Sequence, residues 1–339
     1  MRGVKILVGL FVVGCLAWAG YWWVNAGIRR TAVETWFEQR RAEGWVADYE
    51  ELVITGFPNR VDTKISGLEL ADPRSGWAWS ADEFQLLTLS YQPFAIIAVW
   101  PGEQRFSTPG GGTISAEGQR LRASLAVTAN GAFELVRSRM EGRDIAIRLP
   151  DGETLFVPIL DAASDALDAD ESGTVHRLGL NLENVELSEG LKARFDATGL
   201  LPPAISVVHF DATATFDGTV SLRTIERDAP ELASIRIDDA SGAWGELDLR
   251  AFGDLTADAQ GLAEGELDIR ARNWEAMLDL AVANGALDEG SARAARFGLG
   301  LLASSSGDRN SLEAPITFRD GQARLGPLPI GSAPSLQRQ

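Results

Sequence analysis

Cysteine and histidine are nearly absent from this chain of 339 residues, and their scarcity excludes several kinds of chemistry. The one cysteine, Cys15, lies in an apolar N-terminal run, so the rest of the chain has no disulfide, thiol nucleophile or cysteine metal ligand. Two histidines, His176 and His209, leave little from which to build a histidine metal site or a histidine-activated nucleophile. No phosphate loop or G-x-S-x-G motif occurs either. We therefore expect no enzyme activity and no cofactor.

Basic residues are scarce beyond the N-terminus. Residues 1–43 hold six Lys and Arg against three Asp and Glu, whereas the rest of the chain holds 25 basic and 45 acidic residues. A body this acidic repels nucleic-acid phosphates, so nucleic acid is not an expected partner. Solvated acidic surface that keeps the protein soluble explains most of this charge.

Residues 4–24 form a long apolar run that only Lys5 interrupts. A helix needs roughly 20 apolar residues to cross the hydrocarbon core of a bilayer, so the run predicts a membrane anchor over residues 1–28. Tyr21, Trp22 and Trp23 stand together at its far end, where aromatic rings favour the lipid headgroup layer. These three are the predicted membrane-interface residues.

Two processing signals compete with an uncleaved anchor. Ala17-Trp18-Ala19 resembles a signal-peptidase site, and Val12-Val13-Gly14-Cys15 resembles a loose lipidation motif. Because the apolar run continues through Trp23, whereas polar sequence normally follows a cleavage site, the sequence favours an uncleaved anchor over a cleaved or lipidated form.

Charges beside the anchor do not decide its orientation. Arg2 and Lys5 lie at one end, and the other end is followed by Arg29, Arg30, Arg40 and Arg41. A short basic tail before a long domain fits a signal anchor that exports the domain. We therefore expect a single-pass inner-membrane protein with its body in the periplasm.

Residues 29–44 predict a membrane-proximal helix, because Val33, Trp36 and Phe37 recur at helical spacing before Gly44. From residue 45 on, alternating apolar residues indicate half-buried strands, and pairs such as Asn-Gly and Asp-Gly mark turns. The alternation is clearest at Val61/Thr63/Ile65, Leu121/Ala123/Leu125/Val127, Ile145/Ile147/Leu149, Leu178/Leu180/Leu182, Ile235/Ile237 and Ile316/Phe318. Together they predict a mainly β fold, an antiparallel sheet that is elongated or curled.

An Ala- and Asp-rich stretch at 161–173 indicates two β-rich halves, residues 45–170 and 171–330, ahead of a disordered tail over 331–339. One segment recurs, since GELDLRA at 245–251 returns as GELDIRA at 265–271. The echo indicates either a repeated meander unit or convergent strand patterning. In both interpretations the sheet has one apolar face.

Few helices are expected in the body. Residues 273–303 predict a helical pair, 273–284 and 288–303, broken at Gly285 and with Asp288 as an N-cap. Residues 157–167 fit a short helix. The apolar stretch 93–101, bounded by prolines, fits either a helix that fills the core or a loop that touches the membrane.

The best metal candidate is the segment 168–173. Asp168, Asp170 and Ser172 match ligand positions of a calcium-binding loop. Position twelve, where a bidentate Glu is needed, falls on Gly179. This mismatch favours an acidic linker, so we expect no metal.

Three segments resemble a bacterial envelope family catalogued as domain of unknown function 2125. The first is Gly56-Phe57-Pro58-Asn59-Arg60, of which Gly56, Phe57, Pro58 and Arg60 are the residues we single out. The others are Tyr91-Gln92-Pro93-Phe94 with its apolar continuation, and Pro315–Phe318 followed by Asp320-Gly321 and Leu325–Pro329. The resemblance implies no activity and no catalytic residues. In architecture the chain is more distantly similar to AsmA-like envelope proteins, which implies a curled sheet with an apolar groove and a part in lipid movement or outer-membrane maintenance.

Our leading hypothesis is a non-enzymatic, membrane-anchored periplasmic protein whose sheet offers an apolar groove to lipid and supports envelope maintenance. The alternative is a structural scaffold that binds other envelope proteins through its acidic surface. A third, more distant hypothesis is a hydrolase whose carboxylates converge only in the fold.

Overall fold

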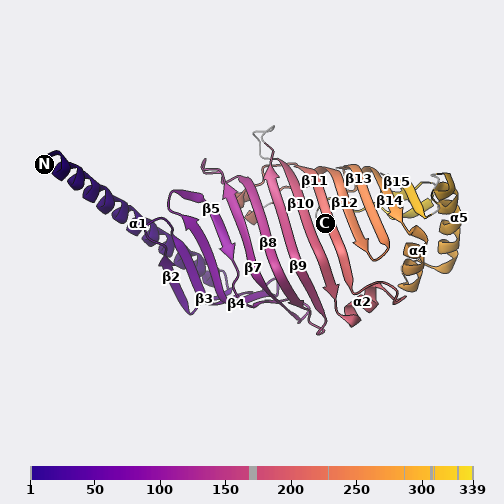
Figure 1. The fold of residues 1–339 in the computed structure, drawn as a ribbon, viewed down its shortest axis with the longest axis horizontal. Helices are drawn as coiled ribbons and strands as arrows, with labels where there is room; N and C mark the ends of the chain where they lie inside the picture. Colours follow the sequence, from indigo (N-terminus) through magenta and orange to yellow (C-terminus); the bar gives the residue numbers. More distant parts are fainter. Residues whose placement is uncertain are drawn as a thin grey trace. The chain divides into compact units, whose positions relative to one another are not determined.

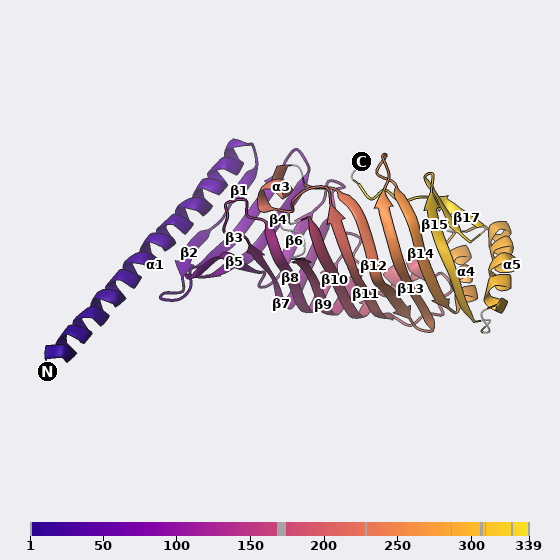
Figure 2. The same ribbon diagram turned by 90° about the horizontal axis from the view of Figure 1, so that it is seen from above.

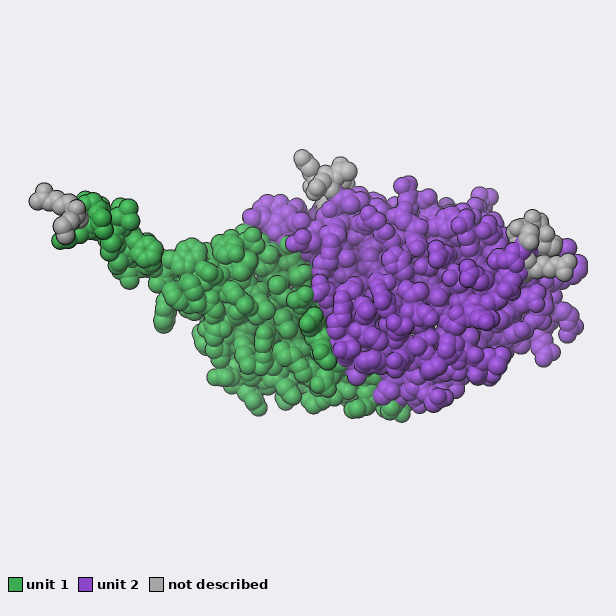
Figure 3. Space-filling view, in the orientation of Figure 1, with its two compact units in different colours: residues 1–126, 147–152 green, residues 127–146, 153–339 purple. Residues whose placement is uncertain are grey.

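The computed structural model describes residues 2–167, 174–227, 229–285, 287–305, 308, 310–326 and 328–337. Within them the protein is mostly antiparallel β structure, with 17 strands and five helices, which confirms the predicted fold class. The chain divides into two compact units, residues 1–126 with 147–152 and residues 127–146 with 153–339 (Figure 3). The boundary predicted near residue 170 falls in 168–173, outside the described residues.

Unit 1 joins one long helix to an antiparallel sheet (Figure 1). Strand β3 pairs with β1, β2 and β4, while β5 and β6 each pair with both β4 and β7. The elements are α1 (Arg2–Ala42), β1 (Val46–Asp48), β2 (Glu51–Thr55), β3 (Asp62–Asp72), β4 (Trp77–Leu89), β5 (Gln92–Val99), β6 (Gln104–Ser107) and β7 (Thr113–Val127), whose last residue belongs to unit 2.

Helix α1 is continuous, so the predicted anchor and the predicted membrane-proximal helix are one element. It ends before Gly44, whose φ of +90° is the left-handed conformation that glycine adopts readily after a helix. Its N-terminal part projects beyond the strands of unit 1 (Figure 2) and is long and apolar enough to cross a membrane. Its C-terminal part packs on the sheet through Phe37, of which only 2% is exposed.

The prediction for residues 93–101 was wrong, because most of this stretch is the strand β5. Ile96 pairs with Thr88 on one side and with Leu125 on the other. A short apolar run cannot be assigned to helix or strand from periodicity alone. Here the β-branched Ile96, Ile97 and Val99 favour the pleated sheet.

Unit 2 is a meander in which each strand from β9 to β17 pairs with the next. Strands β10 to β15 lie side by side, with α4 and α5 at the β15 end (Figure 1). The strands are β8 (Leu135–Arg148, shared with unit 1), β9 (Thr154–Ala166), β10 (Val175–Leu187), β11 (Ala204–Phe216), β12 (Leu232–Trp244), β13 (Leu247–Ala257), β14 (Ala263–Arg272), β15 (Ser311–Arg319), β16 (Gln322–Leu325) and β17 (Leu328–Ser332). The helices are α2 (Glu189–Phe195), α3 (Leu222–Arg227), α4 (Trp274–Ala283) and α5 (Glu289–Ser305).

The helical pair α4 and α5 lies where the sequence predicted it. Asp288 caps α5, since its Oδ1 accepts hydrogen bonds from the backbone N–H groups of Gly290 and Ser291 at 2.9 and 3.0 Å. The short helix predicted at 157–167 was wrong. That stretch is most of β9, because pairing along β10, as at Ala162 opposite Leu180, overrides its alanine-rich composition.

The predicted disordered tail is placed as far as residue 337. Strand β17 extends to Ser332, and Pro334 O accepts a hydrogen bond from Ala263 N at 2.9 Å. Leu336 N donates to Gly261 O at 2.8 Å. The disorder prediction was therefore wrong for residues 331–337, because backbone pairing with the turn at 261–263 holds them.

The echoed segments lie on the neighbouring strands β13 and β14. Leu249 stands opposite Ala271, and Arg250 stands opposite Arg270, so apolar and charged side chains take opposite faces in both copies. The two glycines differ in role. Gly245 lies in the turn before β13, whereas Gly265 lies within β14 at φ +139°, where a Cβ would come within 2.2 Å of Asp254 O.

We predict that Gly265→Ala lowers the free energy of unfolding by about 1–3 kcal/mol, because the added methyl group meets the backbone of β13 in a strained conformation. Urea denaturation of the full chain in detergent measures the change. The control is Gly300→Ala in α5, where no atom lies within 4 Å of the added Cβ and alanine should gain about 0.5–1 kcal/mol. An unchanged unfolding midpoint for Gly265→Ala would contradict the prediction.

Candidate functional site

An apolar groove of about 430 Å³ lies in unit 1, between the C-terminal part of α1 and the strands β3 and β4. All ten of its lining side chains are apolar. They are Ala32, Val33, Trp36 and Phe37 on α1, Ile65, Leu68 and Leu70 on β3, and Trp79, Phe84 and Leu86 on β4. Its volume falls within the roughly 300–1,000 Å³ of typical ligand pockets.

The helix wall of the groove follows from spacing, since residues 32, 33, 36 and 37 share one face of a helix. The strand wall is not built by strict alternation, because the residues of β3 that face α1 shift by one position partway along the strand. Ile65 and Leu68 are three residues apart, yet both pack in the cluster around Phe37. Between them Gly67 adopts φ +61°, and a Cβ there would come within 2.3 Å of the Glu50 side chain. This glycine allows both halves of β3 to present apolar residues to α1.

The indole N–H of Trp79, which lines the groove, is hydrogen-bonded within the protein. Trp79 Nε1 donates to Gln104 Oε1 at 3.1 Å, and Gln104 Nε2 donates to Pro101 O at 3.2 Å. Gln104 is only 1% exposed. Aromatic contacts hold the walls, with the Trp79 ring centroid 5.2 Å from Phe84 and Phe37 4.7 Å from Tyr49. The groove can therefore receive an apolar chain but offers it no polar partner among its lining residues.

One cation lies beside the groove. The Arg40 guanidinium stands 5.5 Å from the ring centroid of Trp36 and 5.6 Å from that of Trp45, and it pairs with Glu43 at 2.8 Å. Its Nε is buried without a hydrogen-bond partner among the described residues. The aromatic rings attract this cation, and Glu43 already offsets its charge.

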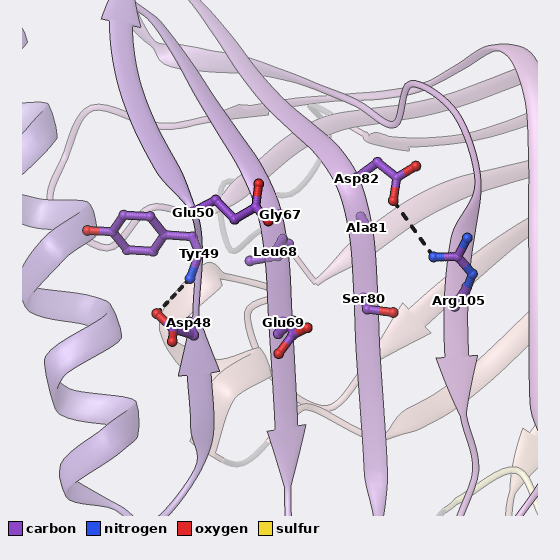
Figure 4. Close-up of a pocket in the computed structure, with 10 residues that line it drawn as sticks. All are labelled: Asp48, Tyr49, Glu50, Gly67, Leu68, Glu69, Ser80, Ala81, Asp82 and Arg105. Atoms are coloured by element: carbon purple, nitrogen blue, oxygen red, sulfur yellow. Dashed lines mark hydrogen bonds and ion pairs between the residues drawn. The ribbon is translucent and has the colours of Figure 1, made fainter.

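The opposite face of the same strands is acidic. A polar pocket of about 350 Å³ there is lined by Asp48, Tyr49, Glu50, Gly67, Leu68, Glu69, Ser80, Ala81, Asp82 and Arg105 (Figure 4). The Tyr49 ring points away from the carboxylates toward α1 (Figure 4). Asp82 lies 3.7 Å from Arg105, and Asp48 lies 3.2 Å from Arg41. No cluster of three metal-binding side chains occurs in the part of the chain that the structure describes.

Unit 2 has a second apolar surface, on one side of its sheet. Residues directly opposite one another in the register form an apolar row across seven strands, Leu178, Ala212, Ile237, Gly253, Leu267, Ile316 and Leu325. Most of this row remains partly exposed. Helices α4 and α5 cover the β13–β15 end of this face, where Trp274 and Leu299 pack on Ala271, Leu312 and Ala314.

The neighbouring row on the other side of this sheet is polar throughout. It runs through Arg177, Thr213, Arg236, Asp254, Glu266, Thr317 and Arg324. Ion pairs cross it, as between Arg177 and Asp211 at 2.6 Å and between Arg236 and Asp254 at 2.9 Å. The Arg177 guanidinium holds the pKa of the Asp211 carboxyl below its ordinary value. Exposed pairs of this kind add little stability and keep that face soluble.

The two histidines serve the sheet. His176 is 1% exposed, and its Nδ1 lies 3.1 Å from Ser164 Oγ on β9. Its ring meets Phe216 edge to face at 6.0 Å. His209 pairs in register with Asn181 and Ser241 on neighbouring strands.

The structure brings together the two sets of residues that the sequence singled out in unit 1. Tyr21 OH donates to Ser90 O at 3.0 Å, and Trp22 Nε1 donates to Arg60 O at 2.5 Å. Trp22 also meets the Phe57 ring edge to face at 5.6 Å. Trp23, by contrast, is 74% exposed. Two of the three predicted interface aromatics thus bind the body of the protein.

The Gly56–Arg60 turn joins β2 to β3. Gly56 has φ +102°, and a Cβ there would come within 2.7 Å of Arg60 Cβ, so glycine is required. Pro58 O accepts a hydrogen bond from Trp18 Nε1 at 2.9 Å, and Arg60 pairs with Asp62 at 2.9 Å. The calcium-loop candidates Asp168, Asp170 and Ser172 lie outside the described residues.

The family follows from comparison with known sequences. The model of the DUF2125 family, described as an uncharacterised protein conserved in bacteria, matches residues 22–334. The chain belongs to this family. No curated protein matches it. The matched range contains the Gly56–Arg60 turn, the groove and the whole meander of unit 2, so these features lie in the part of the chain that the family shares.

The sequence predicted an apolar groove but did not locate it between α1 and the strands β3 and β4. The helical spacing of Val33, Trp36 and Phe37 was visible, but it indicated only an extension of the anchor. The opposing wall comes from β3 and β4, and its alternation changes phase at Gly67. An apolar helix face that repeats beyond the membrane-spanning length was the signal that could have pointed to it.

A buried ion pair in unit 2 generates a pH prediction. The Asp196 side chain is fully buried 3.0 Å from Lys192 Nζ, and it accepts hydrogen bonds from Thr198 Oγ1, Gly199 N and Leu201 N. Burial alone would raise the pKa of this carboxyl, but the hydrogen bonds and Lys192 outweigh it and hold the pKa well below its usual range. The stabilisation is therefore present above the unfolded-state pKa of about 3.9 and is lost as pH falls below it.

We predict that Asp196→Asn costs about 3–5 kcal/mol at pH 7, because Lys192 loses its buried partner. Below pH 4 the difference between variant and parent should shrink, since the carboxyl of Asp196 becomes protonated in the parent's unfolded state, which favours unfolding. Urea titrations at pH 7, 5 and 3 test this, with the exposed Glu189→Gln on the same helix as the control. A pH-independent difference would show that the charge of Asp196 is not what stabilises the fold.

Proposed function

We propose that this protein is anchored in the inner membrane by α1, carries its body in the periplasm, and binds the acyl chain of a lipid in the groove between α1 and β3–β4. The observation that carries the proposal is a groove of about 430 Å³ with ten apolar lining residues beside a helix long enough to span a membrane. The groove holds no side chain suited to acid–base or nucleophilic chemistry, so the proposed role is binding rather than catalysis.

The position of the groove along α1 supports a membrane ligand. Ala32, the first lining residue, lies eight positions after Val24, the end of the apolar run. At 1.5 Å per residue that is about 12 Å, so the groove begins just beyond the predicted end of the membrane span. An acyl chain that leaves the bilayer along α1 meets this groove first. An anionic headgroup that reached Arg40, beside Trp36, would compete with Glu43 for its guanidinium.

The apolar row of unit 2 is a second surface that could contact lipid. Most of its side chains are partly exposed, although they lie within the sheet. Such a surface suits a further apolar ligand or envelope maintenance through contact with lipid. The architectural likeness to AsmA-like proteins stays a prediction, and it points to the same ligand class.

A structural scaffold is the second candidate function. The acidic pocket around Asp48, Glu50 and Asp82 favours it, since a basic envelope protein would complement that charge. The two functions differ in what the groove contacts, and lipid crosslinking separates them.

We predict that a phospholipid with a photoactivatable diazirine in its acyl chain labels the peptides that contain Val33, Trp36 and Ile65–Leu86 when the full chain is embedded in nanodiscs. Ala32→Trp fills the groove and should reduce this labelling by about tenfold, equivalent to ~1.4 kcal/mol of lost binding. Mass spectrometry of the crosslinked peptides gives the measurement.

Two controls sharpen that experiment. Thr35→Trp adds the same ring at an exposed α1 position that does not line the groove, so its labelling should match the parent. Labelling within residues 4–24 should be equal in all three proteins. If the groove peptides stay unlabelled while residues 4–24 are labelled, the lipid-binding proposal fails.

We predict that a C-terminal alkaline-phosphatase fusion is active and that a β-galactosidase fusion at the same position is inactive, because the proposed orientation puts the body in the periplasm. The reverse pattern would place the body in the cytoplasm and overturn the localisation.

A further inference from the structure

Two turns of unit 1 meet at one end of its sheet, and we call them the tip. They are the β2–β3 turn, Gly56–Arg60, and the β4–β5 turn, Ser90–Tyr91. Ser90 N and Ser90 Oγ both donate to Asn59 O at 2.9 Å. The tip is therefore one connected structure.

The tip contacts α1 inside the apolar run, not beyond it. Trp18 donates to Pro58 O and Tyr21 donates to Ser90 O, six and three residues before the run ends at Val24. A hollow between helix and tip is lined by Phe11, Gly14, Cys15, Trp18, Phe57, Pro58 and Asn59. The tip thus reaches back along the segment that is long and apolar enough to span a membrane.

The length of α1 decides where the tip must lie. Between Gly3 and Trp18, the first α1 residue that hydrogen-bonds to the tip, the helix rises through 15 residues, or roughly 22 Å. The hydrocarbon core of a bilayer is about 30 Å thick. A helix that enters this core at Gly3 and crosses it must therefore draw the tip in by about 8 Å. From this geometry we infer that the tip is immersed in the bilayer, at the boundary between headgroups and acyl chains.

The surface of the tip fits that environment. Phe57 is 56% exposed, and Tyr91 is 59% exposed. Phe94, which follows on β5, is 38% exposed. Aromatic rings favour the membrane–water interface, and these three exposed rings match that preference. Arg60, the one basic residue of the tip, is paired with Asp62, and its long side chain can reach the headgroups.

The backbone hydrogen bonding of the tip also suits an apolar medium. Carbonyl groups exposed to hydrocarbon need hydrogen-bond partners inside the protein. The carbonyls of Gly56, Pro58, Asn59, Arg60 and Ser90 each accept a hydrogen bond from the tip or from α1. Three of the donors are the aromatic side chains of Trp18, Tyr21 and Trp22. An ordinary turn in water would not need indole and phenol donors from a membrane helix.

A depth probe tests the inference, which rests on the proposed anchoring by α1. Single cysteines are placed by Phe57→Cys and Tyr91→Cys in a full chain that carries Cys15→Ala, and each is labelled with the environment-sensitive fluorophore NBD. The protein is reconstituted in vesicles of phosphatidylethanolamine and phosphatidylglycerol. Both probes should emit at shorter wavelength than in water and be quenched by lipids spin-labelled in the acyl chain.

Two matched positions make the result interpretable. Trp77→Cys replaces another exposed aromatic, at the opposite end of β4 and roughly 40 Å from Tyr91, so its probe should stay unquenched. Leu7→Cys reports the anchor itself. A quenched probe at Leu7 with unquenched probes at Phe57 and Tyr91 overturns the tip inference and leaves the anchor standing. An unquenched probe at Leu7 overturns both, and quenching at Trp77 equal to that at Phe57 overturns the tip inference.

Discussion

The packing of α1 on β1–β4 is the interaction on which the rest of unit 1 depends. Phe37 lies at its centre, nearly fully buried with Leu52, Ile65 and Leu68 around it. Burial of one such ring stabilises the contact by about a few kcal/mol. This is enough to hold the C-terminal part of α1 rigidly on the sheet. Because the helix is held there, the sheet gains a second wall for its groove and the tip lies against the apolar run.

Much of the fold could be predicted from residue patterns, because one-sided burial of a strand imposes a period of two. The alternation at Leu178/Leu180/Leu182 and at Ile316/Phe318 predicted β10 and β15, and the helical period with Asp288 predicted α4 and α5. The pattern failed where pairing outweighed local preference. Ala162 and its neighbours in β9 read as a helix, yet they are paired along β10.

The candidate site was hidden for a different reason. The groove combines residues of three segments, and its strand wall depends on a phase change at Gly67 that interrupts the alternation. Such a change cannot be recognised in a sequence, because a single glycine does not reveal whether its backbone adopts the left-handed conformation. The Gly56–Arg60 motif was visible, but its contact with Trp18 and Trp22 is tertiary and has no local signature.

The absence of a hinge in α1 has a mechanical consequence. The helix runs unbroken from Arg2 to Ala42, with no proline between the apolar run and the residues that grip the sheet. In the proposed arrangement the helix therefore acts as a rigid lever of about 62 Å rather than as a flexible linker. A change in its tilt, as when bilayer thickness changes, would move the mouth of the groove and the tip together relative to the headgroups. The lipid around the protein would thereby set how readily an acyl chain reaches the groove.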